Sequence, residues 1–456
     1  MRSLVLACGA VLAGALVFTA VAVSAPPAQP TAPRLRAAPP AGTPRAAETL
    51  QARLRRLPGD HRGWALLGLQ YVDQARVTGD PSYYVKADGA LATATRLAPE
   101  DDAVLTGRAA LAAGRHEFSD AVRLAERATA VNPYGAAAYG VLADARTQLG
   151  DLRGARRAVD RMMALRPGVA SFARASYAAE LRGDQKGARS FLQYALDDAY
   201  TPGDVAYVRY YLGELALHGG DLREAADQYG RALAADPGYT PALAGQARVA
   251  ALGGRLTEAL SLYERVVERL PLPQYLIERG ETAAKAGRPA DWTLLRAQRG
   301  LLESAGVRDD LTWAEFEADH GDPARAVRHA RAEYARNPNL VAADALAWAL
   351  FRAGDARAAL PYAVKATSTG WRNPLLHYHR ARVEQALAGG PEQALANGPE
   401  QALANGPTQA LANRPSPSPG GGGDHALAGD AGRPATGGTE SRPGFDPSLP
   451  ALARFS

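Results

Sequence analysis

The histidines and the paired carboxylates are the side chains of this sequence that could catalyse a reaction or hold a metal ion. His377 and His379 are two residues apart, a spacing that directs them to different faces of a helix, so we do not expect them to share a metal ion. The Asp-Asp pairs at 197–198 and 309–310 lie near expected helix ends, and neither has the third acid and glycine spacing of a calcium loop. No Ser-His-Asp arrangement can be assembled with any specificity. The sequence therefore predicts no catalytic residue, no metal site and no cofactor.

Arginine and tyrosine side chains are the better candidates for another kind of chemistry, the recognition of a partner. The chain has 52 basic and 47 acidic residues, and only four of the basic residues are lysines. A net charge of +5 is too small to predict nucleic-acid binding. The preference for arginine over lysine is more readily assigned to genome composition than to function. Recognition must then depend on where the fold places these side chains, not on the total charge.

Prolines recur at a fixed interval and indicate the elements that would position those side chains. Pro133 follows Pro99 by 34 residues, Pro167 follows Pro133 by 34, and Pro271 follows Pro237 by 34. Self-similarity at this period is typical of stacked helix–turn–helix units. No segment shows the strict alternation of a half-buried strand.

The unit that ends at Pro237 shows the pattern in detail. Gly213 and Ala225 are small residues at the expected crossing point of two helices, and Tyr229 would fill the space between neighbouring hairpins. The Gly-Gly-Asp sequence at 219–221 separates the two helices, and the proline stops the second. Each unit is therefore expected to be a pair of antiparallel helices.

The first unit carries the fullest set of these positions: Trp64, Leu67, Gly68, Tyr71, Ala87, Leu91, Ala94 and Pro99. This pattern resembles the tetratricopeptide repeat (TPR) family over residues 46–387, and it is also similar to extracytoplasmic bacterial proteins built almost wholly from such repeats. The resemblance implies an all-α, right-handed α-solenoid of about nine helix–turn–helix repeats with disordered ends. The first unit is seven residues longer than the others, and we expect residues 75–80 to extend its first helix and the following turn.

The resemblance also implies where a partner would bind. The first helices of such repeats line a concave face, so their outward positions are the expected contacts with a protein or peptide. An alternative stays open, in which the tyrosines pack between helices and the arginines are solvated. The candidate partner-binding residues are Arg174, Arg182, Tyr207, Tyr210, Glu214, His218, Arg248, Tyr275, Glu278 and Arg279.

The N-terminus reads as a targeting segment. Arg2 precedes an apolar run from Leu4 to Val23, so residues 1–25 are predicted to be a signal peptide or an uncleaved membrane anchor. Residues 26–45 are rich in proline and alanine and are predicted to be a linker. Cys8 is the only cysteine, so the exported body is expected to have neither disulfides nor thiol chemistry.

The C-terminal part changes character after the predicted solenoid, residues 46–389. The sequence GPEQALAN occurs at 390–397 and 398–405, and GPTQALAN at 406–413. Gly-Pro in every unit of eight does not sustain a helix, so residues 390–440 are predicted to be a disordered tract. Residues 441–456 regain apolar character. They are either the remnant of a C-terminal cap or a frayed tail.

Together these features predict an exported, non-enzymatic scaffold that binds a protein or peptide in its concave groove, with contact to the membrane only through the N-terminal segment. It would be secreted or held at the outer face of the cytoplasmic membrane. The alternative function is a cell-envelope factor that assembles on polysaccharide or peptidoglycan. A role as a hydrolase or transferase accessory has no catalytic segment to support it.

Overall fold

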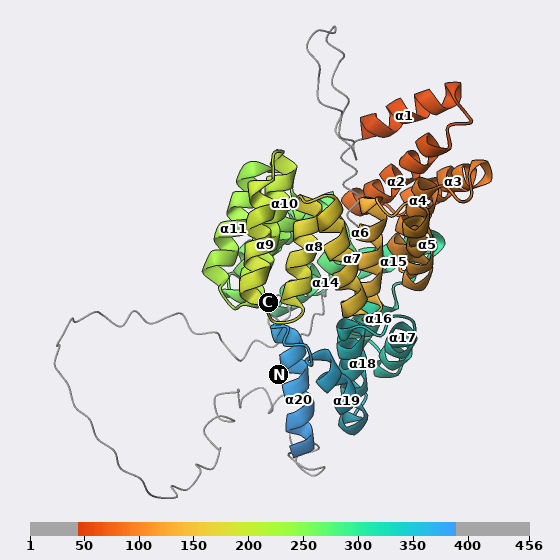
Figure 1. Ribbon diagram of the computed structural model, residues 1–456. Helices are drawn as coiled ribbons and strands as arrows, with labels where there is room; N and C mark the ends of the chain where they lie inside the picture. The colour runs from red at the N-terminus through yellow and green to blue at the C-terminus, as the bar shows by residue number, and fades with distance from the viewer. Residues whose placement is uncertain (1–43, 389–456) are drawn as a thin grey trace, which may run out of the picture.

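The computed structural model describes residues 44–388, which form α-helices joined by short turns and contain no β-strand (Figure 1). The helices are α1 (Pro44–Arg56), α2 (His61–Thr78), α3 (Ser82–Leu97), α4 (Asp102–Gly114), α5 (Phe118–Val131), α6 (Ala136–Gln148), α7 (Leu152–Leu165), α8 (Val169–Glu180), α9 (Gln185–Asp197), α10 (Pro202–His218), α11 (Leu222–Ala235), α12 (Thr240–Leu252), α13 (Leu256–Arg269), α14 (Pro273–Lys285), α15 (Thr293–Ser304), α16 (Asp310–His320), α17 (Pro323–Arg336), α18 (Leu340–Arg352), α19 (Ala356–Ala366) and α20 (Pro374–Ala388). The predictions for the targeting segment, most of the linker, the octapeptide tract and the C-terminal cap lie outside the described residues.

Helices α2 to α19 form nine consecutive pairs, with α1 before them and α20 after them. In each pair the even-numbered first helix packs against the odd-numbered second helix that follows it. This arrangement confirms the expected all-α solenoid of about nine repeats. The predicted extension in the first unit is also present, since α2 continues to Thr78 and Pro81 caps the start of α3.

The sequence explains where these helices begin and turn. Aspartate or asparagine often occupies the N-cap, as at Asp151, whose carboxylate accepts the backbone N–H of Gly154 at 2.8 Å. Between the paired helices the chain often reverses through a glycine in the left-handed region, such as Gly150 with φ of 77°. These local rules produce hairpins of nearly constant length. The regular hairpin length corresponds to the regular proline spacing in the sequence.

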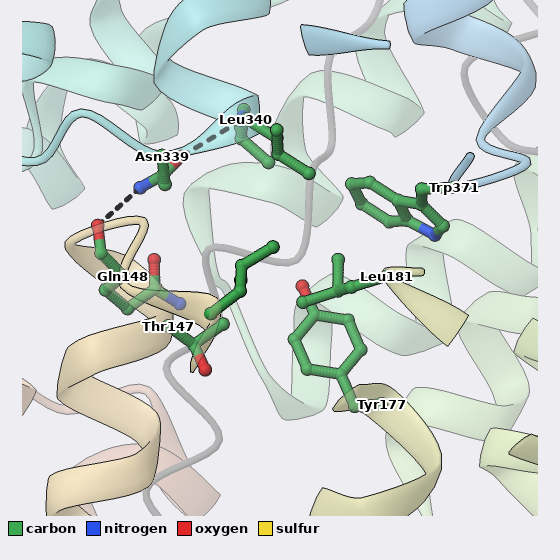
Figure 2. Close-up of a pocket in the computed structure, with 9 residues that line it drawn as sticks. Thr147, Gln148, Tyr177, Leu181, Asn339, Leu340 and Trp371 are labelled. Atoms are coloured by element: carbon green, nitrogen blue, oxygen red, sulfur yellow. Dashed lines mark hydrogen bonds between the residues drawn. The ribbon is translucent and has the colours of Figure 1, made fainter. Parts of the chain in front are cut away.

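The solenoid turns far enough for its later repeats to touch its earlier ones. Arg115 donates to the carbonyl of Ala305, 190 residues away, and Asn339 donates to the carbonyl of Gln148, 191 residues away (Figure 2). A separation of 191 residues corresponds to between five and six units of 34. We call this line of contacts, between the turns of the early repeats and the loops of the late ones, the seam.

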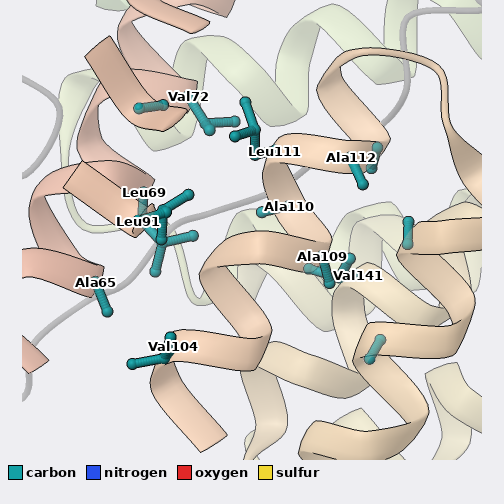
Figure 3. Packing of buried hydrophobic residues seen from close by; sticks show 14 of the residues in the cluster. Ala65, Leu69, Val72, Leu91, Val104, Ala109, Ala110, Leu111, Ala112 and Val141 are labelled. Carbon is teal, nitrogen blue, oxygen red and sulfur yellow. The ribbon is translucent and has the colours of Figure 1, made fainter. Parts of the chain in front are cut away.

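The core of the early repeats consists largely of alanine. Figure 3 shows Ala109 beside Val141 and Ala110 near Leu111, with the helix backbones near one another. Small side chains allow such an approach, and the larger leucines fill the remaining space. Helix pairs of this kind hide their apolar faces only when they stack, so each repeat depends on its neighbours.

Tyr229 of α11 shows how close the packing is. It is fully buried, and a Cβ on Gly245 of α12 would come within 2.6 Å of its ring, while one on Gly213 of α10 would come closer still. We expect Gly213→Ala to lower the free energy of unfolding, relative to Gly230→Ala, by about 1–3 kcal/mol because the tyrosine must move. Gly230 is the matched control, since it lies within α11 and a Cβ there would lie 3.9 Å from the side chain of Gln246. Urea denaturation of the two variants measures the difference, and equal stabilities would contradict the packing argument.

Candidate interaction site

Acidic and basic side chains on the first helices pair from one repeat to the next. Arg174 of α8 donates two hydrogen bonds, of 2.9 and 2.7 Å, to the carboxylate of Asp144 on α6. His218 of α10 lies 2.6 Å from the carboxylate of Glu180 on α8. The same relation joins later first helices through Glu281–His320, Asp319–Arg352 and Asp344–His379. We call this series of pairs between repeats the ionic ladder.

The centre of the ionic ladder is a buried arginine between two carboxylates. The Nη1 of Arg248 on α12 lies 3.0 Å from Glu214 on α10, and its Nε lies 3.2 Å from Glu278 on α14. The three side chains are only 4, 6 and 0 % exposed. Tyr229 donates to Glu214 at 2.5 Å and Gln274 donates to Glu278 at 3.0 Å, which satisfies further carboxylate lone pairs.

The pKa values of these groups follow from burial and pairing. Burial raises the pKa of Glu278, and Arg248 opposes the shift without reversing it. Burial alone would lower the pKa of Arg248, but Glu278 and Glu214 hold it well above its usual range. The pKa of His218 is raised in the same way, since Glu180 outweighs the effect of burial. The direction of each pKa shift thus reflects the balance between burial of the group and its pairing with a group on a neighbouring repeat.

The ten predicted contact residues fall largely within this interior. Arg174, Glu214, Arg248 and Glu278 are buried members of the ionic ladder. Tyr210 and Tyr275 are buried as well, His218, Tyr207 and Arg279 are half-buried, and Arg182 is exposed. A partner could reach the six buried side chains only if their present contacts opened. Partner binding through these residues stays a prediction.

A cluster of tyrosines lies on the same helices. The ring of Tyr211 is 4.7 Å from that of Tyr207 and 5.1 Å from that of Tyr210, and Tyr239 lies 6.0 Å from Tyr210. Burial raises the pKa of Tyr210 and Tyr211 well above the usual value. Arg76, near the end of the extended α2, is close enough to interact electrostatically with Tyr239 and Tyr211. The extra residues of the first repeat therefore reach the tyrosines of the fifth and sixth.

A small cleft opens where the seam crosses between α6–α8 and α18 (Figure 2). Asn339 lies at its edge, where its Nδ2 donates to the carbonyl of Gln148 at 2.7 Å. Its Oδ1 accepts the backbone N–H groups of Val341 and Ala342 at 2.9 Å and so caps α18. One side chain thus starts a helix in the late repeats and holds it to the early ones. The cleft is lined by Thr147, Gln148, Leu152, Tyr177, Leu181, Asn339, Leu340, Val341 and Trp371.

Trp371 forms the next contact along the seam. Its indole N–H donates to Glu180 at 3.1 Å, and its ring meets those of Tyr177 and His218 edge-on at 6.4 and 6.0 Å. Trp371 is buried, although it lies in the loop between α19 and α20. Glu180 therefore serves both the ionic ladder, through His218, and the seam.

The two roles of Asn339 can be separated by substitution. Asn339→Asp keeps the oxygen that caps α18 and loses the donor to Gln148, whereas Asn339→Ala loses both. We expect the alanine variant to lose about 1–2 kcal/mol from the cap alone, with faster hydrogen exchange in both α18 and residues 147–150. The aspartate variant should show faster exchange at 147–150 while α18 stays protected. If the aspartate variant exchanges like the wild type, the hydrogen bond to Gln148 does not stabilise the seam.

The seam residues Arg115, Asn339 and Trp371 were absent from the sequence prediction. No periodic signal relates them, because their partners lie more than five repeats away and belong to different positions of the unit. The ionic ladder did have a signal. Glu214 and Arg248 are 34 residues apart and of opposite charge, as expected for neighbouring first helices.

Residues 44–388 contain neither of two other functional features. No group of three or more histidine, cysteine, aspartate or glutamate side chains in this range is arranged to hold a metal ion. None of the helices in the same range is long and apolar enough to cross a bilayer.

Similarity to known proteins is found only among solved structures. No family model matches the sequence, and no curated protein matches it. Among solved structures, a tetratricopeptide repeat protein from Parabacteroides merdae is 16% identical, covers 52% of this chain and 91% of its own, and superposes with a TM-score of 0.41. A thermophilic TPR protein from Thermus thermophilus, TTC0263, is 22% identical over 46% of this chain and 100% of its own, with a TM-score of 0.35. A human IFIT1 dimer with m7Gppp-AAAA is 13% identical over 71% of this chain and 85% of its own, with a TM-score of 0.42. At these scores the fold assignment rests on the nine helix pairs themselves.

Proposed function

We propose that this solenoid of TPR-type helix pairs is an exported, non-enzymatic scaffold that binds another protein. The observation that carries the proposal is the use made of its ionisable side chains. The acidic and basic residues of the first helices pair between repeats, as in the Glu214–Arg248–Glu278 set. These charges are therefore used to connect neighbouring repeats and do not form a reactive site. Stacked repeats of this kind offer an extended surface to a partner.

Export is the part of the proposal that depends on the N-terminus. The apolar run from Leu4 to Val23 after Arg2 supports a targeting segment. Fractionation of cells that produce the full chain tests it, with detection of the C-terminal body in cytoplasmic, membrane and external fractions. Recovery in the cytoplasmic fraction alone would contradict export while leaving the scaffold function open.

The scaffold function is tested by photo-crosslinking in intact cells. A photoreactive residue at Arg182, the exposed member of the predicted groove set, should give a discrete protein adduct. The same residue at Arg223, exposed on α11, samples another surface for comparison. An absence of protein adducts from both positions would count against the scaffold.

An association with envelope polysaccharide is the second candidate, and exposed aromatic rings favour it. Tyr194 and Tyr200 are 55 and 86 % exposed, and Phe172 lies 5.9 Å from the ring of Tyr194. Exposed rings of this kind can stack on a ligand. If the Tyr194→Ala/Tyr200→Ala variant loses sedimentation with purified peptidoglycan while keeping its protein adducts, the second function is supported.

A further inference from the structure

Two strongly basic helices, far apart in the sequence, are brought together by the seam. Helix α7 carries four arginines and one aspartate, and α17 carries four arginines and one glutamate. No helix from α2 to α19 has a larger surplus of positive charge. Both are second helices of their repeats, and both present arginines to solvent.

The segments next to the two helices are in contact. Helix α17 ends at Arg336, two residues before Pro338, and α7 begins at Leu152, two residues after Gly150. A Cβ on Gly150 would lie 2.8 Å from the carbonyl oxygen of Pro338, so the chain segments that flank the two helices are in direct contact. The seam thus brings the start of one basic helix close to the end of the other.

Several arginines of these helices are already neutralised. Arg156 pairs with Asp160 at 2.7 Å, Arg325 with Glu317 at 3.1 Å, and Arg336 with Asp310 at 2.6 Å. Five others are exposed and make no ion pair with any residue in the described range, 44–388. These five, which we call the basic column, are Arg153, Arg157 and Arg161 of α7 and Arg328 and Arg331 of α17.

An aromatic anchor stands beside the basic column. The guanidinium of Arg161 lies 5.9 Å from the ring of Tyr134 and 6.0 Å from that of Tyr139, and Tyr134 is 78 % exposed. Arginine and tyrosine are both among the residue types enriched where binding energy is concentrated. The column therefore has both the charge and the apolar contact of a protein-binding surface.

We propose that the basic column binds an acidic helical segment of a partner protein, and this rests on the scaffold function proposed above. Arg153, Arg157 and Arg161 follow one another at intervals of four residues, which is about 6 Å along a helix. Glutamates at intervals of four on a partner helix have the same spacing. Each guanidinium can hold a carboxylate through two parallel hydrogen bonds.

The test uses the full chain and two fluorescent helical peptides. In one peptide glutamates occupy every fourth position of one face, and in the other the same residues are distributed around the helix. We expect the first to bind more tightly, and we expect Arg153→Glu/Arg157→Glu/Arg161→Glu to weaken it by about tenfold or more. Fluorescence anisotropy at two salt concentrations measures both effects.

The matched control is Arg223→Glu/Arg265→Glu/Arg296→Glu, which makes the same change in charge at three exposed arginines outside the column. It should bind the peptide within about twofold of the wild type, because long-range effects are screened by salt. Equal losses in the two triple variants, or equal binding of the two peptides, would overturn the proposal. So would a column that binds heparin or phosphatidylglycerol vesicles but neither peptide. Melting followed by circular dichroism confirms that both variants are folded.

The outcome is separable from that of the scaffold function. If the triple column variant keeps the protein adducts formed at Arg182, the scaffold stands and the column is not its binding surface. If the wild type forms no adduct in cells but still prefers the peptide with glutamates on one face, the basic column recognises acidic helices. The proposed scaffold function would then be contradicted.

Discussion

Replacing Arg248 with methionine should lower the free energy of unfolding by about 3–5 kcal/mol. The substitution keeps an unbranched apolar stem and removes the cation that Glu214 and Glu278 share in the interior. Two buried carboxylates would then keep their neutral hydrogen-bond donors but have no positive charge between them. Urea denaturation followed by circular dichroism measures the loss. Arg223→Met, at an exposed position of α11, is the control and should change stability by about 0.5 kcal/mol or less.

The loss should also depend on pH in a direction that identifies its cause. Burial already raises the pKa of Glu278, and removal of Arg248 raises it further. A carboxyl whose folded-state pKa lies above its unfolded value gives most stability below the unfolded value, about 4.3, and loses it as the pH rises through the folded-state pKa. The deficit of the methionine variant relative to the wild type should therefore shrink as the pH falls from 7 towards 4. A deficit that stays constant over this range would assign the loss to packing instead of charge.

Replacing Trp371 with alanine should open the seam without unfolding the repeats. The indole is buried against Tyr177 and His218 and donates to Glu180, so its truncation removes apolar contact and a hydrogen bond at once. Truncation of a buried tryptophan costs about 3–5 kcal/mol, and here the cost falls on a contact between repeats that are not neighbours in the chain. We expect the helical circular dichroism signal to be retained and the radius of gyration in X-ray scattering to increase.

Hydrogen exchange locates the same effect. In the Trp371→Ala variant, exchange should accelerate at residues 180–183 and 370–371, which face each other across the seam, and less within α11 and α12. The Tyr200→Ala variant removes an aromatic ring that is 86 % exposed and serves as the control. An unchanged radius of gyration together with unchanged exchange would show that the seam does not depend on Trp371.

Much of the fold could be predicted from local sequence because local contacts determine it. The prolines at intervals of 34 mark where second helices end, and Gly213, Ala225 and Tyr229 occupy the positions that set the distance between helices. The extension of α2 to Thr78 was also predictable, since the extra residues are consistent with two further turns of helix. These features involve only a repeat and its neighbour.

The candidate site was harder to predict because one residue type can serve two purposes. Arg248 and Glu278 lie on first helices, as expected, but the sequence does not state whether such charges face a groove or one another. The structure pairs them between repeats. A comparison of charge sign at positions 30 to 39 residues apart would have favoured the ionic ladder, since Asp144–Arg174 and Glu281–His320 follow the same rule.

The contacts of the seam could not be predicted from the sequence, for a different reason. Its position depends on a small rotation between each repeat and the next, summed over more than five repeats. An error of a few degrees per repeat would bring Trp371 to another partner or to none.

The contacts between Asn339 and Gln148 and between Trp371 and Glu180 share a separation of 191 residues. A solenoid that stays open can gain or lose a unit by duplication or deletion, since every new unit finds the same neighbours. In this chain an additional 34 residues between α9 and α17 would preserve the packing between adjacent units. The insertion would nevertheless move Trp371 away from Glu180. Selection can therefore act on the number of repeats itself. A descendant that duplicates a unit would have to lose that unit again or evolve new contacts between its early and late repeats.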